Sequence, residues 1–131
     1  ANDIARTFVK KLRTQKKKEI FEIIEHAKIA KEFIKSKNFD DLGLLLNETW
    51  KIKRSLSSKI SNTRLDEIYS KALKNGVIGG KLLGAGGGGY FLFFTTPFNR
   101  HKVMNWIKEE KLIHTPFVFE TNGLQSWTVR S

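Results

Sequence analysis

The first quarter of the chain repeats its apolar residues at helical spacing. Residues 3–36 contain no proline or glycine, so nothing in this stretch interrupts a helix. Five apolar side chains share one face at this spacing: Ile20, Ile23, Ile24, Ala27 and Ile34. A single helix over this stretch would be about 50 Å long. We therefore expect either one long helix or two helices with a break near Lys16 to Lys18.

A second helical pattern begins after Asn38 or Asp40, either of which can cap a helix N-terminus. Its apolar face comprises Leu42, Leu45, Leu46, Trp50 and Leu56. Lys53 lies within this apolar face, and Ser57 follows one turn later on the same side of the helix. A lysine at such a position either extends its ammonium group to the edge of the domain or reaches into a cleft.

A third helical pattern starts at a capping box formed by Thr63 and Asp66 and stops at Gly76. The period then changes to two short apolar runs, 77–83 and 90–95, which predict strands. The second run is apolar at every position from 90 to 94. That pattern is typical of a central strand whose two faces are both covered.

The C-terminal third predicts one more helix and a hairpin. Pro97 is placed to open a short helix that carries apolar residues on one face. Residues 114–121 predict a strand, the Asn-Gly pair at 122–123 predicts a hairpin turn, and 124–130 predict the returning strand. The whole pattern, 1–131, predicts a single α+β domain in which an antiparallel sheet packs against helices.

Composition narrows the class of protein. The chain has 131 residues, with 24 lysines and arginines against 13 aspartates and glutamates, and it has no cysteine. Disulfide frameworks and thiolate metal sites are therefore excluded. No apolar run approaches the roughly 20 residues that cross a bilayer, and the N-terminus lacks an apolar signal segment. We expect a soluble, cytoplasmic protein that spans no membrane.

The net charge of +11 is concentrated at the N-terminus. Residues 1–18 carry seven basic side chains and one acidic side chain, or 7 − 1 = +6. Such an arm can bind nucleic acid, but only Phe8 interleaves the basic run, and single-strand binding relies on aromatic stacking. We favour a solvated helix face, with nucleic acid as the less favoured partner.

A glycine-rich loop separates the two predicted strands. It consists of Gly84, Ala85, Gly86, Gly87, Gly88 and Gly89. Glycine clusters of this kind indicate unusual backbone angles or close approach by another group, and successive amides can converge on an anion. The spacing also matches a dinucleotide fingerprint, but that site requires a helix after the loop, and here a strand follows. The residues alone leave two interpretations open, a wide turn and a loop that faces phosphate.

A resemblance favours the second interpretation. Residues 80–89, Gly-Lys-Leu-Leu-Gly-Ala-Gly-Gly-Gly-Gly, resemble the third motif of the GHMP kinases, the superfamily of galactokinase, homoserine kinase, mevalonate kinase and phosphomevalonate kinase. Residues 50–62 and 123–127 are similar to the branch of that superfamily that phosphorylates heptose phosphates. The likeness covers nearly all of the chain.

Two motifs of the superfamily are missing from this sequence. Its first motif is absent, and so is the Pro-x-Gly-Leu-Gly-Ser-Ser-like loop that holds the nucleotide triphosphate. The resemblance therefore implies the C-terminal domain of a kinase without its nucleotide-loop N-terminal domain, inactive on its own. The superfamily also places a strand just before the first helix, which implies a ferredoxin-like sheet lacking its first strand. We expect 124–130 or a neighbouring molecule to cover that gap.

The resemblance implies transfer of the ATP γ-phosphoryl group to a sugar or a sugar phosphate such as heptose 7-phosphate, in the synthesis of nucleotide-sugar precursors. ATP and Mg²⁺ would be held mainly by the missing domain, and the sequence indicates neither a catalytic residue nor a metal ligand here. The residues implied at the phosphates are those of the glycine loop and Lys81, although Lys81 can equally face solvent. The residues implied at the substrate's own phosphate are Lys53, Arg54, Ser57 and Ser58. The alternatives are a basic nucleic-acid-binding module and a protein-interaction module whose glycine loop is only a turn.

Overall fold

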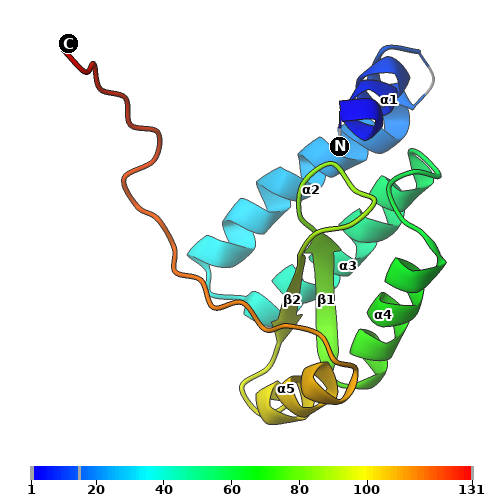
Figure 1. The fold of residues 1–131 in the computed structure, drawn as a ribbon, viewed down its shortest axis with the longest axis vertical. Coiled ribbons are helices and arrows are strands. Elements are labelled where there is room, and N and C mark those ends of the chain that lie inside the picture. Colours follow the sequence, from blue (N-terminus) through cyan, green and yellow to red (C-terminus); the bar gives the residue numbers. More distant parts are fainter. Residues whose placement is uncertain (1, 15, 131) are drawn as a thin grey trace.

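The computed structural model describes residues 2–14 and 16–130 and shows helices packed around a small sheet (Figure 1). The elements in chain order are α1 (Asn2–Thr14), α2 (Lys17–Lys35), α3 (Phe39–Ser55), α4 (Thr63–Lys74), β1 (Val77–Leu82), β2 (Phe91–Thr95) and α5 (Arg100–Glu109). The predicted α+β class with an antiparallel sheet is confirmed. Within the described residues, no helix combines the length and the apolar character that a membrane span requires.

The N-terminal helical stretch is divided into α1 and α2, as the alternative with a break near Lys16 predicted. Lys16 itself is not helical, and Gln15 lies outside the described residues. α1 folds back beside the start of α2, while α2 runs along α3 (Figure 1). The apolar face of α2 is only partly buried, because no residue of this helix is fully covered.

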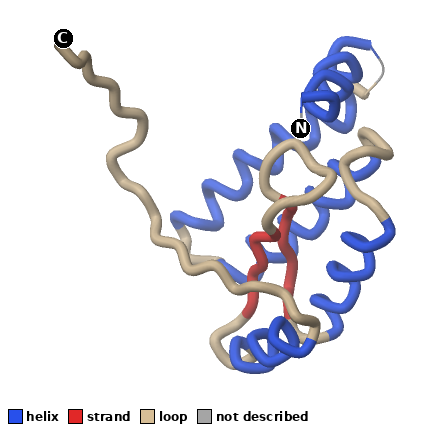
Figure 2. Tube along the Cα trace, viewed as in Figure 1, coloured by secondary structure: helices blue, strands red, loops and turns tan. Residues whose placement is uncertain are grey.

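The sheet consists of β1 and β2, which pair antiparallel in the register Gly80 to Phe93 and Leu82 to Phe91 (Figure 2). α3 lies directly on β1 because two glycines meet there. A Cβ at Gly79 would overlap the carbonyl oxygen of Gly43, and a Cβ at Gly43 would lie 2.8 Å from the Cγ2 of Ile78. A glycine inside a strand pattern often marks such an approach of another backbone.

Two apolar clusters form the core. One contains Trp50, Leu56, Ile60, Tyr69 and Leu82, and the other contains Ile68, Ala72, Val77, Val103 and Trp106. Phe91 and Phe93 of β2 pack against both clusters, with their rings stacked at a centroid separation of 5.1 Å. Through these two rings, the sheet connects the apolar cluster near α5 with the apolar cluster near the glycine loop.

β2 does not have the doubly covered character that its sequence predicted. All five of its residues are only partly buried, since the described sheet has two strands and β2 forms one edge of it. A run of apolar residues is compatible with a central strand, but the pattern cannot show whether a neighbouring strand exists.

Two helix starts differ from the predicted ones. The side chain that caps α4 belongs to Asn62, whose Oδ1 accepts from the backbone N–H of Leu65 at 3.0 Å, so Thr63 is the first helical residue. α5 begins at Arg100, because Pro97 lies in a turn in which the backbone N–H of Asn99 donates to the carbonyl of Thr96. Asn ranks above Thr as an N-cap residue, so Asn62 takes the cap and Thr63 lies one position inside the helix.

The predicted C-terminal hairpin is wrong. Residues 114–130 form no strand, and all of them are exposed. Figure 2 shows this segment as an extended loop that runs away from the domain. Gly123 has the positive φ expected of a turn glycine, at 65°, but an isolated two-stranded hairpin is at best marginally stable in water. Residues 124–130 therefore do not complete the sheet, contrary to expectation.

Candidate functional site

The glycine loop connects the ends of β1 and β2 at the side of the domain opposite α5 (Figure 1). Its neck is closed by a hydrogen bond of 2.8 Å from the backbone N–H of Leu83 to the carbonyl of Tyr90. Four of its glycines have positive φ, namely Gly84, Gly86, Gly87 and Gly89. Side chains at these four positions would be strained, so the backbone path itself requires glycine.

One side of the loop packs on the chain segment that follows α3. The backbone N–H of Gly87 donates to the carbonyl of Ile60 at 2.9 Å. A Cβ at Gly86 would lie 2.8 Å from the Cα of Ile60, and a Cβ at Gly87 would lie 2.7 Å from the Cδ1 of Ile4 in α1. The amide of Gly87 is thus occupied within the fold and is not free for a ligand.

The other side of the loop is open. A Cβ built at Gly84 or at Gly88 meets nothing within 4 Å, and the φ of Gly88 is not positive. We define this as the open side of the loop, in contrast to the packed side formed by Gly86 and Gly87. A ligand that approached the loop backbone would do so from the open side.

Lys53 reaches the glycine loop from α3. Its Nζ donates to the carbonyl of Gly84 at 2.9 Å. The pKa of Lys53 is lowered, first by burial and then by the neighbouring charge of Lys81 on β1. The side chain of Lys53 is partly buried and is directed toward the glycine loop by this hydrogen bond.

Arg54 lies elsewhere, in a hollow between the end of α3 and the start of α4. This hollow has a volume of about 330 Å³ and is lined by Lys51, Arg54, Ser55, Ser57, Ser58, Ser61 and Asp66. The Nη1 of Arg54 contacts an oxygen of Asp66 at 2.9 Å, and the Oγ of Ser61 donates to that same oxygen at 2.7 Å. Arg54 therefore already has a carboxylate partner.

Asp66 is held in its ionised form by these contacts. Burial alone would raise the pKa of its carboxyl group, but the hydrogen bonds from Ser61 and Arg54 outweigh burial and lower the pKa. The guanidinium of Arg54 also lies over the ring of Trp50, at 5.8 Å from the centroid. These contacts orient Arg54 toward α4 rather than toward the glycine loop.

Ser57 and Ser58 differ in exposure although they are adjacent. Ser57 is 3% exposed, and its Oγ accepts from the backbone N–H of Lys59 at 3.3 Å. Its carbonyl accepts from the backbone N–H of Ile60 at 3.2 Å, so Ser57 shapes the turn that carries Ile60 to the packed side of the loop. Ser58 is exposed at the hollow. The four predicted substrate residues therefore divide between two places.

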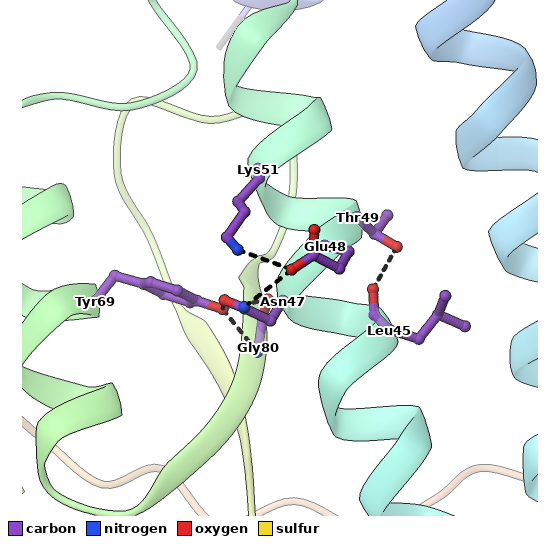
Figure 3. Close-up of polar contacts among 7 residues, drawn as sticks. All are labelled: Leu45, Asn47, Glu48, Thr49, Lys51, Tyr69 and Gly80. Atoms are coloured by element: carbon purple, nitrogen blue, oxygen red, sulfur yellow. Dashed lines mark hydrogen bonds and ion pairs between the residues drawn. The ribbon is translucent and has the colours of Figure 1, made fainter.

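A buried polar contact that the sequence did not reveal joins α3, α4 and β1 (Figure 3). The hydroxyl of Tyr69 accepts from the backbone N–H of Gly80 at 3.1 Å and donates to the Oδ1 of Asn47 at 2.9 Å. Burial raises the pKa of Tyr69 despite the hydrogen bond from Gly80. The only sequence signal was a tyrosine in the buried stripe of α4, which packing alone would explain. This contact holds the strand that leads into the glycine loop.

Metal ligands are not gathered in this part of the protein. Among residues 2–14 and 16–130, no group of three or more His, Cys, Asp or Glu side chains is arranged to hold a metal ion. Successive backbone amides of a glycine-rich loop can converge on an anion.

Comparisons with known proteins identify relatives of this chain. A family described as GHMP kinases C terminal matches residues 29–110, more than half of the chain. The D-glycero-alpha-D-manno-heptose 7-phosphate kinase of Campylobacter jejuni subsp. jejuni serotype O:2 is 32% identical over 130 residues, which are 98% of this chain and 38% of that protein.

A solved structure shares the fold. The mevalonate kinase of L. major, crystallised with R-mevalonate, superimposes with a TM-score of 0.70 and 19% sequence identity over 83% of this chain and 34% of that one. The present chain thus spans little more than a third of the length of either relative.

Proposed function

The chain belongs to the family of GHMP kinase C-terminal domains. We therefore propose that it is the C-terminal domain of an ATP-dependent kinase that phosphorylates a sugar or a sugar phosphate. The observation that carries the choice of acceptor is the 32% identity, over 98% of the chain, to a heptose 7-phosphate kinase. We propose a heptose 7-phosphate as the acceptor and the synthesis of nucleotide-sugar precursors as the purpose. A cytoplasmic location, where ATP is abundant, belongs to the same proposal.

In this proposal the glycine loop forms one wall of the cleft in which the phosphoryl group is transferred. Such a transfer depends on positioning and on stabilising charge spread over the phosphoryl oxygens. The open side at Gly84 and Gly88 supports this role, because backbone there is unobstructed. Ala85, Gly86, Gly87 and Gly89 hold the shape of the loop, and the amide of Gly87 acts inside the fold.

The substrate's own phosphate is proposed to lie near the end of α3. Lys53 at the loop and Arg54, Ser57 and Ser58 at the neighbouring hollow are the candidate contacts. Arg54 is the least available of them, since Asp66 already neutralises its charge. The nucleotide and its Mg²⁺ are proposed to be held mainly by the part of the longer relatives that this chain does not span. The partner of this domain is accordingly that nucleotide-binding part of the kinase.

The test compares this chain with the longest reading frame that contains it. Each protein is incubated with ATP, Mg²⁺ and a panel of sugars and sugar phosphates, and products are followed by ³¹P NMR. We expect ATP-dependent phosphorylation of a heptose phosphate by the longer protein and none by the 131-residue chain. The proposal fails if the longer protein phosphorylates no sugar or sugar phosphate. Salt-sensitive binding to random DNA in its place would support a nucleic-acid function.

A further inference from the structure

One buried hydroxyl group, that of Tyr69, contacts both α3 and the strand that leads into the glycine loop (Figure 3). Its oxygen lies 3.1 Å from the backbone nitrogen of Gly80, 2.9 Å from the Oδ1 of Asn47 and 3.4 Å from the carbonyl oxygen of Gly80. Gly80 belongs to β1 and precedes Gly84, the first glycine of the loop, by four residues. The hydroxyl therefore joins α3 to β1 close to the point where the loop begins.

The directions of these hydrogen bonds follow from counting protons. A hydroxyl has one proton to donate, whereas a backbone N–H can only donate. The N–H of Gly80 therefore donates to the hydroxyl, and the proton of the hydroxyl goes to its nearer acceptor, the Oδ1 of Asn47. The bonds run in sequence from Gly80 through Tyr69 to Asn47, so the loss of one hydroxyl breaks both of them.

Asn47 can take part in this contact because glycine allows α3 to approach β1 closely. A Cβ at Gly79 would lie 2.9 Å from the backbone nitrogen of Asn47 and 3.0 Å from its Cβ. Asn47 is on the same helix as Lys53, whose Nζ donates to the carbonyl of Gly84 at 2.9 Å. The bond between Tyr69 and Asn47 therefore helps to fix where α3, and with it Lys53, stands along β1.

The ring of Tyr69 belongs to the apolar cluster that supports the loop from its packed side. This cluster includes Leu82, the last residue of β1, and Ile60. The carbonyl of Ile60 accepts from the backbone N–H of Gly87 at 2.9 Å. The two supports of the loop, the end of β1 and the backbone at Ile60, thus meet in the cluster that contains Tyr69.

We propose that Tyr69 and Asn47 are positioning residues of the kinase, which hold the glycine loop where its open side receives the phosphates. The inference rests on the proposed function and deepens it. Neither side chain lies on the open side, since a Cβ at Gly84 or Gly88 would meet nothing within 4 Å. The pair acts through the backbone of β1. A displacement of about 1 Å in such a site can lower the rate about 100-fold.

The first experiment follows the backbone amide signals of the 131-residue chain by NMR. Tyr69→Phe keeps the ring in its cluster and removes only the hydroxyl. We expect the signals of Gly80 and of residues 84–89 to shift, and hydrogen exchange at Gly80 to become faster. The matched control is Val103→Ala, which removes buried volume from the other apolar cluster, on α5 at the opposite side of the domain. It should leave the signals of 84–89 in place.

The second experiment measures steady-state kinetics of the longer protein at a temperature at which a thermal melt shows every variant folded. We expect kcat to fall roughly 10- to 100-fold in Tyr69→Phe and to stay unchanged in Val103→Ala. The KM for the acceptor should not change in Tyr69→Phe, because a misplaced loop weakens the transition state rather than the binding of substrate.

Two variants of Asn47 test the other member of the pair. Asn47→Asp keeps an oxygen that accepts from the hydroxyl, so it should retain most of the kcat. Asn47→Leu removes that acceptor, and its kcat should fall, but less than in Tyr69→Phe, because the carbonyl of Gly80 at 3.4 Å can accept the hydroxyl proton instead.

Three results would overturn the positioning role. They are loop signals that do not move in Tyr69→Phe, equal effects of Tyr69→Phe and Val103→Ala on kcat, and equal values of kcat in the two Asn47 variants. A longer protein that phosphorylates no sugar or sugar phosphate would instead reject the proposed function. In that case the NMR comparison in the 131-residue chain still decides whether Tyr69 sets the position of the loop.

Discussion

Replacing Gly88 with valine distinguishes the two interpretations of the glycine loop, a loop that faces phosphate and a loop that is only a turn. Gly88 does not need a positive φ, and a Cβ there meets nothing within 4 Å. The folded domain should therefore accept valine with a change in the free energy of unfolding within about 0.5 kcal/mol. The added side chain would nevertheless fill the open side of the loop, where we place the reacting phosphates.

The expected loss of activity is large by comparison. Removal of one donor from a site that stabilises developing charge typically lowers the rate about 10²–10³-fold. We expect a loss of kcat/KM of this order for Gly88→Val in the longer protein, because the valine displaces the phosphate from the loop amides. Stability and activity should thus respond separately to this one substitution.

The matched control is Gly86→Val, on the packed side of the same loop. Gly86 has a φ of 114°, and its Cβ would lie 2.8 Å from the Cα of Ile60, which is backbone and cannot move aside easily. Backbone strain of this kind costs about 1–3 kcal/mol. At about 4 °C for each kcal/mol in a domain of this size, the thermal midpoint should fall by roughly 4–12 °C.

The assay pairs a thermal melt with steady-state kinetics on the same preparation of each variant. Full kcat/KM in Gly88→Val would refute a role for the open side in phosphoryl transfer. A midpoint for Gly88→Val as low as that for Gly86→Val would refute the division of the loop into an open and a packed side.

Three further outcomes test the fold. Tyr69→Phe should cost about 1–3 kcal/mol in a urea titration, because the buried N–H of Gly80 loses its partner; no loss would mean that the hydroxyl is dispensable. Hydrogen bonds from Lys71, and to a smaller extent from Arg64, lower the pKa of Glu110 although desolvation acts to raise it. The ionised carboxylate of Glu110 therefore stabilises the fold above pH 4.5, and this stabilisation is lost as the pH falls through the lowered pKa. Glu110→Gln should flatten that part of the stability profile, and an unchanged profile contradicts the ion pairs. Deletion of residues 114–131 should leave the thermal midpoint unchanged, because 114–130 are exposed; a lower midpoint would show that the segment packs on the domain.

Local sequence patterns were sufficient to locate the regular elements near the core. The spacing of apolar residues and the stop at Gly76 predicted α4, and the change of period predicted β1 and β2 to within a residue or two. These signals are strong because burial of one face depends on the repeat of the helix or strand itself. The predicted strands after residue 113 failed, since a strand also requires a neighbour that the local pattern does not specify.

The sequence by itself determined that the loop is rich in glycine and that Lys53 occupies the inward phase of its helix. Only the tertiary structure decided which contacts follow. Lys53 and Arg54 are adjacent in the chain but about 100° apart around the helix, so one meets Gly84 and the other meets Asp66. Gly84 and Asp66 belong to other parts of the chain, and they lie within hydrogen-bonding distance only because those parts pack beside α3. For the same reason the glycine run could not show which of its positions lie against Ile60 and which remain open.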